Sequence, residues 1–264
     1  MPVRPRVLIL RAPGTNCDVE TAFAFERAGG QAERWHINRV LEAPHRLAEF
    51  QILCIPGGFS YGDDVAAGRI FANQLRRHLA EALHQFKAAD KLILGICNGF
   101  QVLIKSGLLL DDAPGLGPQA TLTWNDSGKY EDRWVRLRVW GSKCVFLRGI
   151  DTMYLPVAHA EGKFVPRDGV ALEALARDEQ LVLKYCPLGG ENAVAEAGTP
   201  YPDNPNGSVA DVAGVCDTSG RVFGLMPHPE RHIDPFQHPQ WTRGKARDPG
   251  DGLQVFRNAI AYFS

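Results

Sequence analysis

Residues 91–107, KLILGICNGFQVLIKSG, place a cysteine between two glycines, at the end of an apolar run and directly before a helical pattern. Short apolar runs bounded by turn residues are typical of buried strands, and the residues after Cys97 predict a helix over Asn98 to Ser106. Ligands of doubly wound sheets bind beyond the carboxyl ends of the strands. We therefore expect Cys97 at the ligand-binding edge of a sheet.

Similar apolar runs recur on the N-terminal side of this stretch. RVLIL (6–10), QILCI (51–55) and KLILGI (91–96) are bounded by Gly or Pro and alternate with longer segments of helical period. This alternation predicts an α/β fold, with an open, mostly parallel twisted sheet and helices on both faces.

The segments between and after these runs complete the predicted architecture. DVETAFAFERAGG (18–30) predicts a helix capped by Asn16 or Asp18 with Val19, Ala22, Phe23 and Phe25 buried, and residues 69–90 predict one long helix. RWVRLRVW (133–140) alternates in polarity, which favours antiparallel strands that extend the sheet. No repeat or long linker divides the chain, so we expect one domain over 1–264.

Gly95-Ile96-Cys97-Asn98-Gly99 has the spacing of the G-x-S-x-G nucleophile elbow, with sulfur in place of oxygen. The glycines would let other backbone approach a strained turn, and the amides that open the next helix favour a thiolate. These residues alone leave two interpretations open, a nucleophile or a small buried hydrophobic side chain.

A general base for this thiol is found in GLMPHPERH, residues 224–232, which follows another apolar run. If the chain stays extended through Pro229, His228 and Glu230 lie on one face, so that Glu230 can orient the imidazole while His228 takes the thiol proton. A zinc site at His228 and His232, a zinc-deaminase H-x-E motif and a lone surface His-Glu pair are the alternatives. We expect no metal, because a third ligand and a P-C-x-x-C partner are missing from the sequence.

A second glycine-rich turn, CIPGGFSYGDD (54–64), follows the run that ends at residue 55. Gly57 and Gly58 lack Cβ atoms and can turn their amides toward a ligand, which would supply an oxyanion donor beside the amide of Asn98. A plain tight turn is the alternative.

The composition excludes several classes of partner. With 29 Lys and Arg against 30 Asp and Glu the formal charge is −1, so we expect no nucleic acid partner. The start of the chain has only four consecutive apolar residues, Val7 to Leu10, too few for a signal peptide or a membrane span. Six scattered cysteines without a C-x-x-C pair favour reduced thiols. We expect a cytoplasmic protein with no membrane partner.

The motifs together resemble the class I glutamine amidotransferases, whose glutaminase domain uses a Cys-His-Glu triad on an open α/β sheet. The resemblance rests on PGGFSYGDDVAAGRIFANQL (56–75), GICNGFQVL (95–103) and MPHPERH (226–232). Further similar stretches spread it over essentially the whole chain: LRAPGTNCDVETAFAFERAGG (10–30), WNDSGKYEDRWV (124–135), PVAHAEGKF (156–164) and NPNGSVADVAGVCD (204–217).

This resemblance implies a role for individual residues. Cys97 would be the nucleophile, His228 the general base and then acid, and Glu230 the orienting carboxylate. The amides of Gly58 and Asn98 would form the oxyanion hole. The implied contacts to glutamine come from Gly57, Gln101, Asn125 and Ser127.

The resemblance also implies partners. The substrate would be L-glutamine, and the ammonia released from it would pass to a large synthetase subunit, with a small third subunit in the assembly. ATP and Mg²⁺ are expected on the synthetase and no cofactor in this chain, which lacks a G-x-x-x-x-G-K-[ST] phosphate loop. A stand-alone cysteine hydrolase or peptidase and a catalytically silent regulatory subunit remain as alternatives.

Three features depart from the family pattern or have no assigned role. Ala160 stands where the family usually has glycine, and His159 and Glu161 beside it would be either interface groups or solvated surface groups. Cys17 would be either a packing residue or a family-specific contact. Residues 238–252 predict a surface loop, either at the interface with a partner or away from it.

Overall fold

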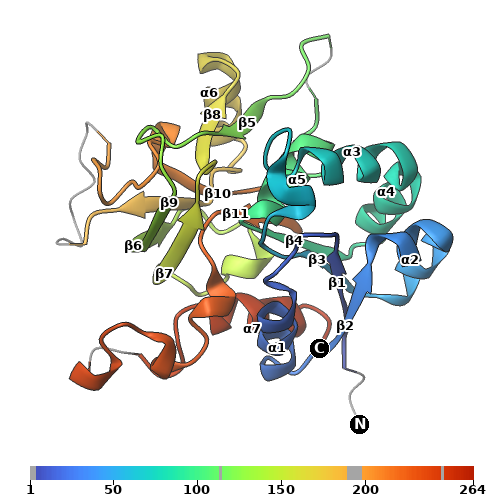
Figure 1. The fold of residues 1–264 in the computed structure, drawn as a ribbon, viewed down its shortest axis with the longest axis horizontal. Helices are drawn as coiled ribbons and strands as arrows, with labels where there is room; N and C mark the ends of the chain where they lie inside the picture. The colour runs from blue at the N-terminus through green and yellow to red at the C-terminus, as the bar shows by residue number, and fades with distance from the viewer. Residues whose placement is uncertain (1–3, 113–114, 189–197, 245–246) are drawn as a thin grey trace.

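A nine-stranded sheet forms the centre of the molecule in a computed structural model that describes residues 4–112, 115–188, 198–244 and 247–264 (Figure 1). Its strands, in spatial order, are β2 (Gln31–His36), β1 (Arg6–Arg11), β3 (Ile52–Ile55), β4 (Leu92–Ile96), β11 (Val222–Leu225), β10 (Val212–Cys216), β9 (Leu183–Cys186), β6 (Glu131–Val139) and β7 (Thr152–His159).

The sheet has a parallel half and an antiparallel half. Strands β2, β1, β3, β4 and β11 are parallel to one another, whereas β10, β9, β6 and β7 continue the sheet from β11 with antiparallel pairing. A separate antiparallel pair, β5 (Ala120–Thr123) with β8 (Lys163–Pro166), lies apart from the main sheet. The predicted α/β fold, an open parallel sheet with an antiparallel extension, is confirmed.

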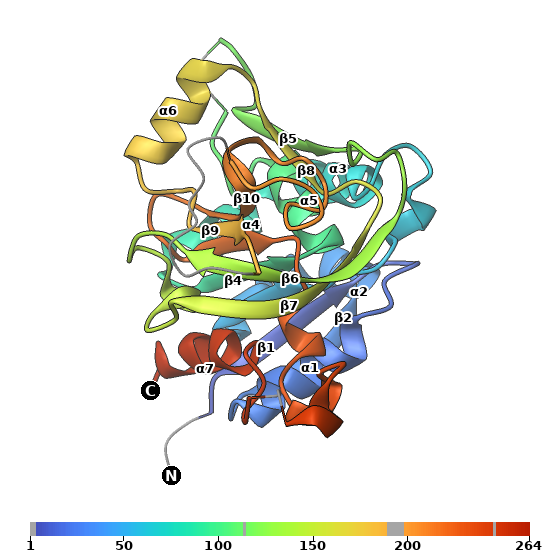
Figure 2. The ribbon, with the colours of Figure 1, turned by 90° about the vertical axis from the view of Figure 1, so that its left-hand side faces the viewer.

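Helices cover both faces of the sheet. Figures 1 and 2 show α1 and α7 together on one face and α3, α4 and α5 on the other. The α-helices of the described residues are α1 (Asp18–Arg27), α2 (Ile37–Glu42), α3 (Arg69–His78), α4 (Ala80–Ala88), α5 (Asn98–Ser106), α6 (Gly169–Arg177) and α7 (Leu253–Ala261). The short 3₁₀ turns are η1 (Pro44–Glu49), η2 (Ser60–Asp63), η3 (Val145–Leu147), η4 (Val209–Asp211), η5 (Pro229–Arg231), η6 (Pro235–Gln237) and η7 (Trp241–Arg243). None of the helices in these ranges combines the length and the apolar character that a membrane crossing needs.

The first helix differs from its prediction in cap and in face. No side chain caps α1, so neither Asn16 nor Asp18 plays the predicted role. Val19 and Phe23 are 59% and 53% exposed, while Phe25 is fully buried. Val19 and Phe23 are four residues apart and share a face, and Phe25 points about 200° away from Phe23 in a helix of 3.6 residues per turn. The prediction grouped two opposite faces into one stripe.

The long helix predicted over 69–90 is two helices. It is interrupted at Leu79, whose φ of −124° and ψ of 6° are not helical, so that α3 ends at His78 and α4 begins at Ala80. No Gly or Pro stands at the break, and its cause is not apparent from the local sequence. Leu75, Leu79 and Leu83 are buried before, at and after the break.

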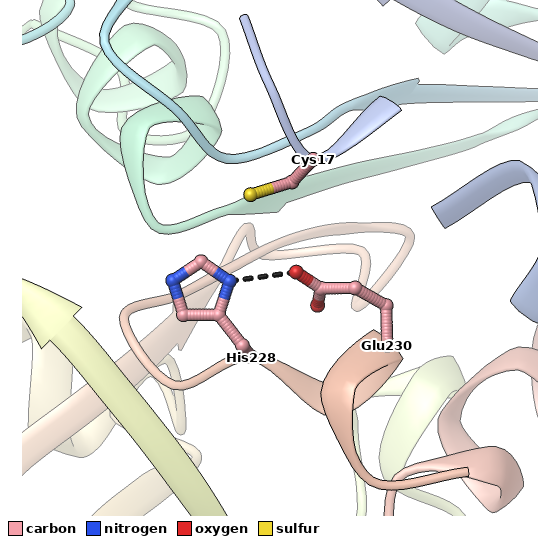
Figure 3. Close-up of side chains that lie close together, drawn as sticks. All are labelled: Cys17, His228 and Glu230. Atoms are coloured by element: carbon pink, nitrogen blue, oxygen red, sulfur yellow. Dashed lines mark hydrogen bonds and ion pairs between the residues drawn. The ribbon is translucent and has the colours of Figure 1, made fainter. Parts of the chain in front are cut away.

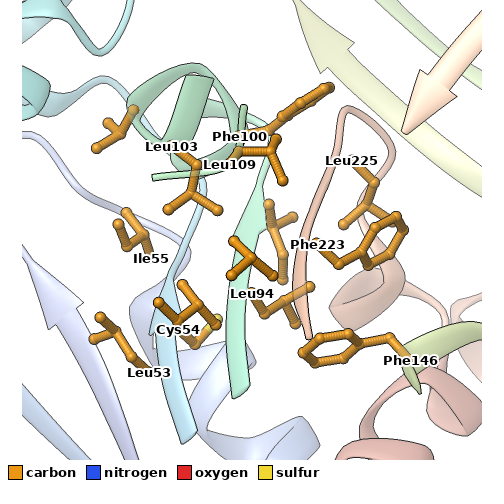
Figure 4. Packing of buried hydrophobic residues seen from close by; sticks show 14 of the residues in the cluster. Leu53, Cys54, Ile55, Leu94, Phe100, Leu103, Leu109, Phe146, Phe223 and Leu225 are labelled. Carbon is orange, nitrogen blue, oxygen red and sulfur yellow. The ribbon is translucent and has the colours of Figure 1, made fainter. Parts of the chain in front are cut away.

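Helix α5 packs unusually close to the sheet. A Cβ atom on Gly99 would lie 1.8 Å from the carbonyl oxygen of Ile55 on β3, so only glycine allows this contact. On the other side, a Cβ on Gly224 of β11 would lie 2.2 Å from the ring of Phe100. Figure 4 shows Phe100 of this helix among the apolar side chains of β3, β4 and β11. Full burial of an aromatic or leucine side chain stabilises a fold by roughly 1.5–3 kcal/mol, so this packing holds α5 firmly in place.

We expect Gly99→Ala to lower the free energy of unfolding by roughly 3 kcal/mol, because the new methyl group would force α5 away from β3. Urea denaturation followed by circular dichroism measures the change. Gly107→Ala at the end of the same helix is the control: Gly107 has φ 77°, but a Cβ added there would meet no atom within 4 Å, so only the backbone strain of about 1 kcal/mol applies. Equal losses in the two variants would contradict the proposed close contact.

Candidate active site

Three predicted motifs meet at one edge of the sheet because three adjacent parallel strands end there. Strands β3, β4 and β11 are paired in a register that places Ile55 beside Gly95 and Leu225 beside Ile96. The carboxyl ends of these strands lead into the Pro-Gly-Gly turn, the cysteine elbow and the MPHPERH segment, respectively. Segments that lie far apart in the chain are therefore neighbours.

The cysteine lies on a strained turn between β4 and α5. Cys97 has φ 50° and ψ −105°, a conformation that L-residues rarely adopt, and its amide donates to the carbonyl oxygen of Leu225 at 2.8 Å. Helix α5 spans Asn98–Ser106, as predicted. Cys97 is only 5% exposed, yet it lines a cleft of about 250 Å³. The thiol is therefore at the floor of a cleft and not sealed in the core.

The imidazole of His228 is held by the carboxylate of Glu230. Nδ1 of His228 lies 2.6 Å from Oε1 of Glu230, and both side chains are buried. The predicted extended backbone is wrong: the chain turns through η5 (Pro229–Arg231), and this 3₁₀ turn brings the two side chains together. A 3₁₀ turn suits the proline, whose fixed φ is compatible with the first helical position. Nε2 of His228 has no hydrogen-bond partner within the described residues.

The electrostatics of this pair favour a protonated imidazole. Burial alone lowers the pKa of His228, but the carboxylate of Glu230 and the sulfur of Cys97 outweigh burial and hold that pKa well above its usual value of 6.5. A protonated His228 is the form that can donate a proton to a leaving group.

A second sulfur lies beside the same imidazole. Figure 3 shows Cys17 next to His228 and Glu230. Its Sγ accepts from Nη2 of Arg231 at 3.2 Å, and the thiol donates to Oδ1 of Asn16 at 3.3 Å. Sequence reasoning left the role of Cys17 open, although its place in the loop between β1 and α1 was a usable signal, since β1 lies beside β3 in the sheet.

Glycine is required where this sulfur and the imidazole meet. A Cβ on Gly57 would lie 2.8 Å from Cε1 of His228 and 3.2 Å from Sγ of Cys17. The carbonyl of Gly57 accepts from the amide of Cys17 at 3.3 Å. Gly57, predicted to contact glutamine, thus lies against the imidazole; it is not one of the residues that line the cleft around Cys97.

The loop after β1 also supports the predicted oxyanion turn. Phe59 donates its amide to the carbonyl of Gly14 at 3.0 Å, and Thr15 forms an isolated bridge with Gly58. Gly58 has φ 136°, and a Cβ there would lie 2.7 Å from the amide nitrogen of Asn16. Gly58 therefore lies beside Cys97 in the cleft with a conformation that favours glycine.

One group of side chains in the described ranges offers donor atoms that a metal ion could use. The ligand atoms of Cys17, His228 and Glu230 lie within 4.8 Å of one another. His232, weighed as a zinc ligand in the sequence, is elsewhere, with Nδ1 2.7 Å from the carbonyl oxygen of Tyr154. In this group Nδ1 of His228 and Oε1 of Glu230 share a hydrogen bond, and the sulfur of Cys17 accepts from Arg231. Nε2 of His228 and Oε2 of Glu230 have no hydrogen-bond partner in the described residues.

The lining of the cleft around Cys97 includes two carboxyl side chains. Asp63 and Glu161 are its two charged lining groups, and burial raises the pKa of Asp63. Gln101 donates Nε2 to the carbonyl of Glu161 at 2.5 Å and accepts from Nδ2 of Asn98 at 2.9 Å, so its amide connects α5 to this part of the lining. The cleft therefore has a thiol and two carboxyl groups in its lining, which can meet an electrophilic carbon and a cationic group of a small ligand.

Asn125 and Ser127 are not among the residues that line this cleft. Nδ2 of Asn125 donates to the carbonyls of Lys129 and His159, at 2.9 and 2.8 Å, and Oγ of Ser127 accepts from the amide of Lys129 at 3.3 Å. Their observed bonds organise the loop, and a direct role in binding glutamine stays a prediction.

The expectation for His159 is wrong, because its side chain is neither solvated nor available to a partner. The ring is buried, with Nδ1 3.1 Å from Oδ1 of Asn125, and a Cβ on Gly162 would lie 2.3 Å from it. Burial and then the charge of His228 lower the pKa of His159 from 6.5 to about 3. A neutral His159 behind the site leaves His228 as the imidazole that carries charge.

A thiol on a strand-to-helix elbow, beside a hydrogen-bonded His-Glu pair on an open α/β sheet, is an arrangement of glutamine amidotransferases. A family model described as a CobB/CobQ-like glutamine amidotransferase domain matches residues 4–263, and the chain belongs to this family.

Its relatives within the family include phosphoribosylformylglycinamidine synthase subunits. Subunit PurQ of Dehalococcoides mccartyi is 48% identical over 261 residues, which cover 97% of each chain, and PurQ of Methanococcus maripaludis is 41% identical over 99% of this chain and 98% of the relative. Among solved structures, that of PurLQS from Thermotoga maritima contains a chain with a TM-score of 0.74 and 30% identity, covering 99% of this chain and 100% of that one.

We expect Glu230→Gln to lower kcat/KM for glutamine hydrolysis by roughly 10²- to 10⁴-fold and to move the alkaline limb of the pH profile to lower pH. Without the carboxylate, burial dominates and the pKa of His228 falls. Glu173→Gln, on the exposed face of α6, is the matched control and should leave the profile unchanged. An unshifted alkaline limb in Glu230→Gln would contradict the role assigned to this pair.

The same pair predicts a pH dependence of stability. Because the folded pKa of His228 is raised, its contribution is fully present below the unfolded value of about 6.5 and is lost as pH rises through the folded pKa. The difference in unfolding free energy between the wild type and Glu230→Gln, measured by urea denaturation at a series of pH values, should therefore shrink with rising pH.

We expect Cys17→Ala to lower kcat about tenfold with little change in KM, because the imidazole loses a neighbour that fixes its position. Cys17→Ser should recover part of this loss, since a hydroxyl can still accept from Arg231. Cys216→Ala, which removes a fully buried thiol in β10, tests for a general effect of instability. Equal activity losses in Cys17→Ala and Cys216→Ala would show that Cys17 acts through stability alone.

Proposed function

We propose that this chain is the glutaminase subunit of a phosphoribosylformylglycinamidine synthase. One observation carries the proposal: the sulfur of Cys97 lies at the floor of a cleft, next to an imidazole that Glu230 holds and whose pKa is raised. The full-length similarity to PurQ subunits supports the choice of this synthase among the amidotransferases.

In the proposed first half-reaction the thiolate of Cys97 attacks the side-chain amide carbon of L-glutamine. The negative charge that develops on the amide oxygen is stabilised by the backbone amides of Gly58 and Asn98. Asn98 is the first residue of α5, so its amide has no acceptor within the helix and points toward the elbow. The C–N bond then breaks, and His228 donates its proton to the leaving nitrogen, which releases ammonia.

In the second half-reaction water hydrolyses the glutamyl thioester. The imidazole of His228, now neutral, takes a proton from the water as it attacks, and the sulfur leaves as a thiolate. The products are glutamate and the original Cys97–His228 charge pair. The carboxylates of Asp63 and Glu161 would attract the α-ammonium group of glutamine at the far end of the cleft, together with the predicted contacts from Gly57, Gln101, Asn125 and Ser127.

The ammonia is used by a second protein. We infer that a large synthetase subunit consumes it with ATP and Mg²⁺ to convert formylglycinamide ribonucleotide to formylglycinamidine ribonucleotide, a step of de novo purine synthesis, and that a small third subunit completes the assembly. The similarity to a chain of PurLQS from Thermotoga maritima supports an assembly of this kind. This chain then needs no cofactor of its own, and we expect the complex in the cytoplasm.

We expect Cys97→Ala to abolish glutamine-dependent synthesis, by at least about 10³-fold, while the reconstituted complex still uses added ammonium salts. The measurement is product formation by synthetase, third subunit and this chain with either nitrogen source. Retained glutamine turnover would contradict the assignment of the nucleophile.

The same assay separates the alternatives. Rapid turnover of peptides or esters without turnover of glutamine would favour a stand-alone cysteine hydrolase. Failure of a reactive glutamine analogue, 6-diazo-5-oxo-L-norleucine, to label Cys97 would favour a silent regulatory subunit. If the synthetase that works with this chain catalyses a different reaction with ammonia, the assigned pathway would change, whereas the assignment of this chain as a glutaminase would stand.

A further inference from the structure

A groove larger than the cleft around Cys97 adjoins it. The groove has a volume of about 760 Å³, against about 250 Å³ for the cleft, and lies between α3, α5 and β5. Trp124 and Glu161 line both cavities, so the two are continuous at these side chains. Nothing in the proposed glutaminase chemistry uses the groove.

One side of the groove is the free edge of a strand. β5 pairs with β8 in a two-stranded sheet, and its other edge has no strand partner among the described residues. All four residues of β5, Ala120 to Thr123, line the groove. Successive side chains of a strand point to opposite faces of its sheet, so one face of β5 could contribute only every second residue to the groove. Since every residue of β5 lines the groove, the strand faces it with its edge. Free backbone amides and carbonyls at such an edge can pair with an extended segment of another chain.

The rest of the lining is apolar and basic. Val65 and Trp124 are 61% and 60% exposed at the groove, which leaves apolar surface for a partner to cover. Arg69 and Arg76 project from α3 into the lining, and in the part of the chain that the structure describes no acid pairs with either of them. The formal charge of the whole chain is −1, so this basic character is local.

The remaining charged groups of the groove are already engaged. Lys105 donates Nζ to the carbonyl of Ala67 at 2.5 Å, and both carboxylate oxygens of Glu161 lie 3.3 Å from the amide of Ala67. These bonds anchor the boundary between groove and cleft. The two arginines of α3 are therefore the cations that a ligand of the groove would meet.

We propose that this groove docks an extended segment of the synthetase, with alternating apolar and acidic side chains, that pairs with the edge of β5. The proposal rests on the proposed function, which supplies the synthetase. Strand pairing fixes the register of the segment, the apolar side chains cover Val65 and Trp124, and the acidic ones meet Arg69 and Arg76. A segment seated here lies against the boundary of the Cys97 cleft, so docking and release of ammonia occur at adjoining surfaces.

Charge reversal on α3 tests the basic side of the groove. Arg69→Glu and Arg76→Glu should each raise the Kd for the purified synthetase about tenfold, and should weaken the dependence of binding on salt, because each removes an attraction to an acidic group. Arg77→Glu is the matched control: it is the next residue on the same helix, is exposed, and does not line the groove. It should bind within about twofold of the wild type.

Backbone pairing is tested by amide hydrogen exchange of this chain with and without the synthetase. Residues of β5 should become protected in the complex, whereas the proposal is overturned if β5 exchanges equally in both states. It is also overturned if Arg69→Glu and Arg76→Glu bind like Arg77→Glu, or if they abolish a homodimer of this chain and leave synthetase binding intact.

The proposed function has its own readout in the same samples. Labelling of Cys97 by 6-diazo-5-oxo-L-norleucine should be equal in the wild type and all three arginine variants. If the wild type binds the synthetase but the groove variants do so equally well, the docking site is wrong and the function stands. If the wild type neither labels nor binds, the function fails and the docking proposal with it.

Discussion

The contact between α5 and the backbone of β3 at Gly99 is the constraint on which the rest of the site depends. A side chain on Gly99 would bring its Cβ to 1.8 Å from the carbonyl oxygen of Ile55, so the helix can lie this close only because that residue has none. The close helix leaves a single sharp turn to connect β4 with α5, and Cys97 occupies it with positive φ. The position of the nucleophile thus follows from the packing of α5, which the apolar contacts around Phe100 stabilise, and the thiol of Cys97 donates to the carbonyl oxygen of Ala158 at 3.7 Å.

Charge at the site is divided unequally between two buried histidines. His228 has the carboxylate of Glu230 at 2.6 Å, and this attraction exceeds the cost of burial. Within the described residues His159 has the side-chain amides of Asn125 and Asn206 as partners and no carboxylate, so burial dominates and lowers its pKa to about 3. Burial lowers the pKa of both rings. The carboxylate that is hydrogen-bonded to His228 decides which of the two carries a proton.

The loop after β1 connects elements that the chemistry must keep in register. It bonds to the glycine turn through the amides of Cys17 and Phe59 and contacts the imidazole through the sulfur of Cys17. On the opposite side, Gln101 and Glu161 connect α5 to the boundary of the large groove. The cleft is thus supported on one side by an internal loop and adjoins on the other the groove that Arg69, Arg76 and β5 line, where the described residues supply no acid for the arginines and no second strand for β5.

The sequence alone determined the strand runs, the elbow around Cys97, the limits of α5 and the pairing of His228 with Glu230, because each depends on local spacing or on a short motif. It misjudged α1 by grouping two opposite helix faces into one buried stripe, and it missed the break at Leu79 and the 3₁₀ turn through Pro229. Cys17 and the neutral state of His159 were decided only by the fold. The neighbours of these two residues come from distant segments of the chain. Contacts between such segments produce no periodic pattern that could be recognised in the sequence.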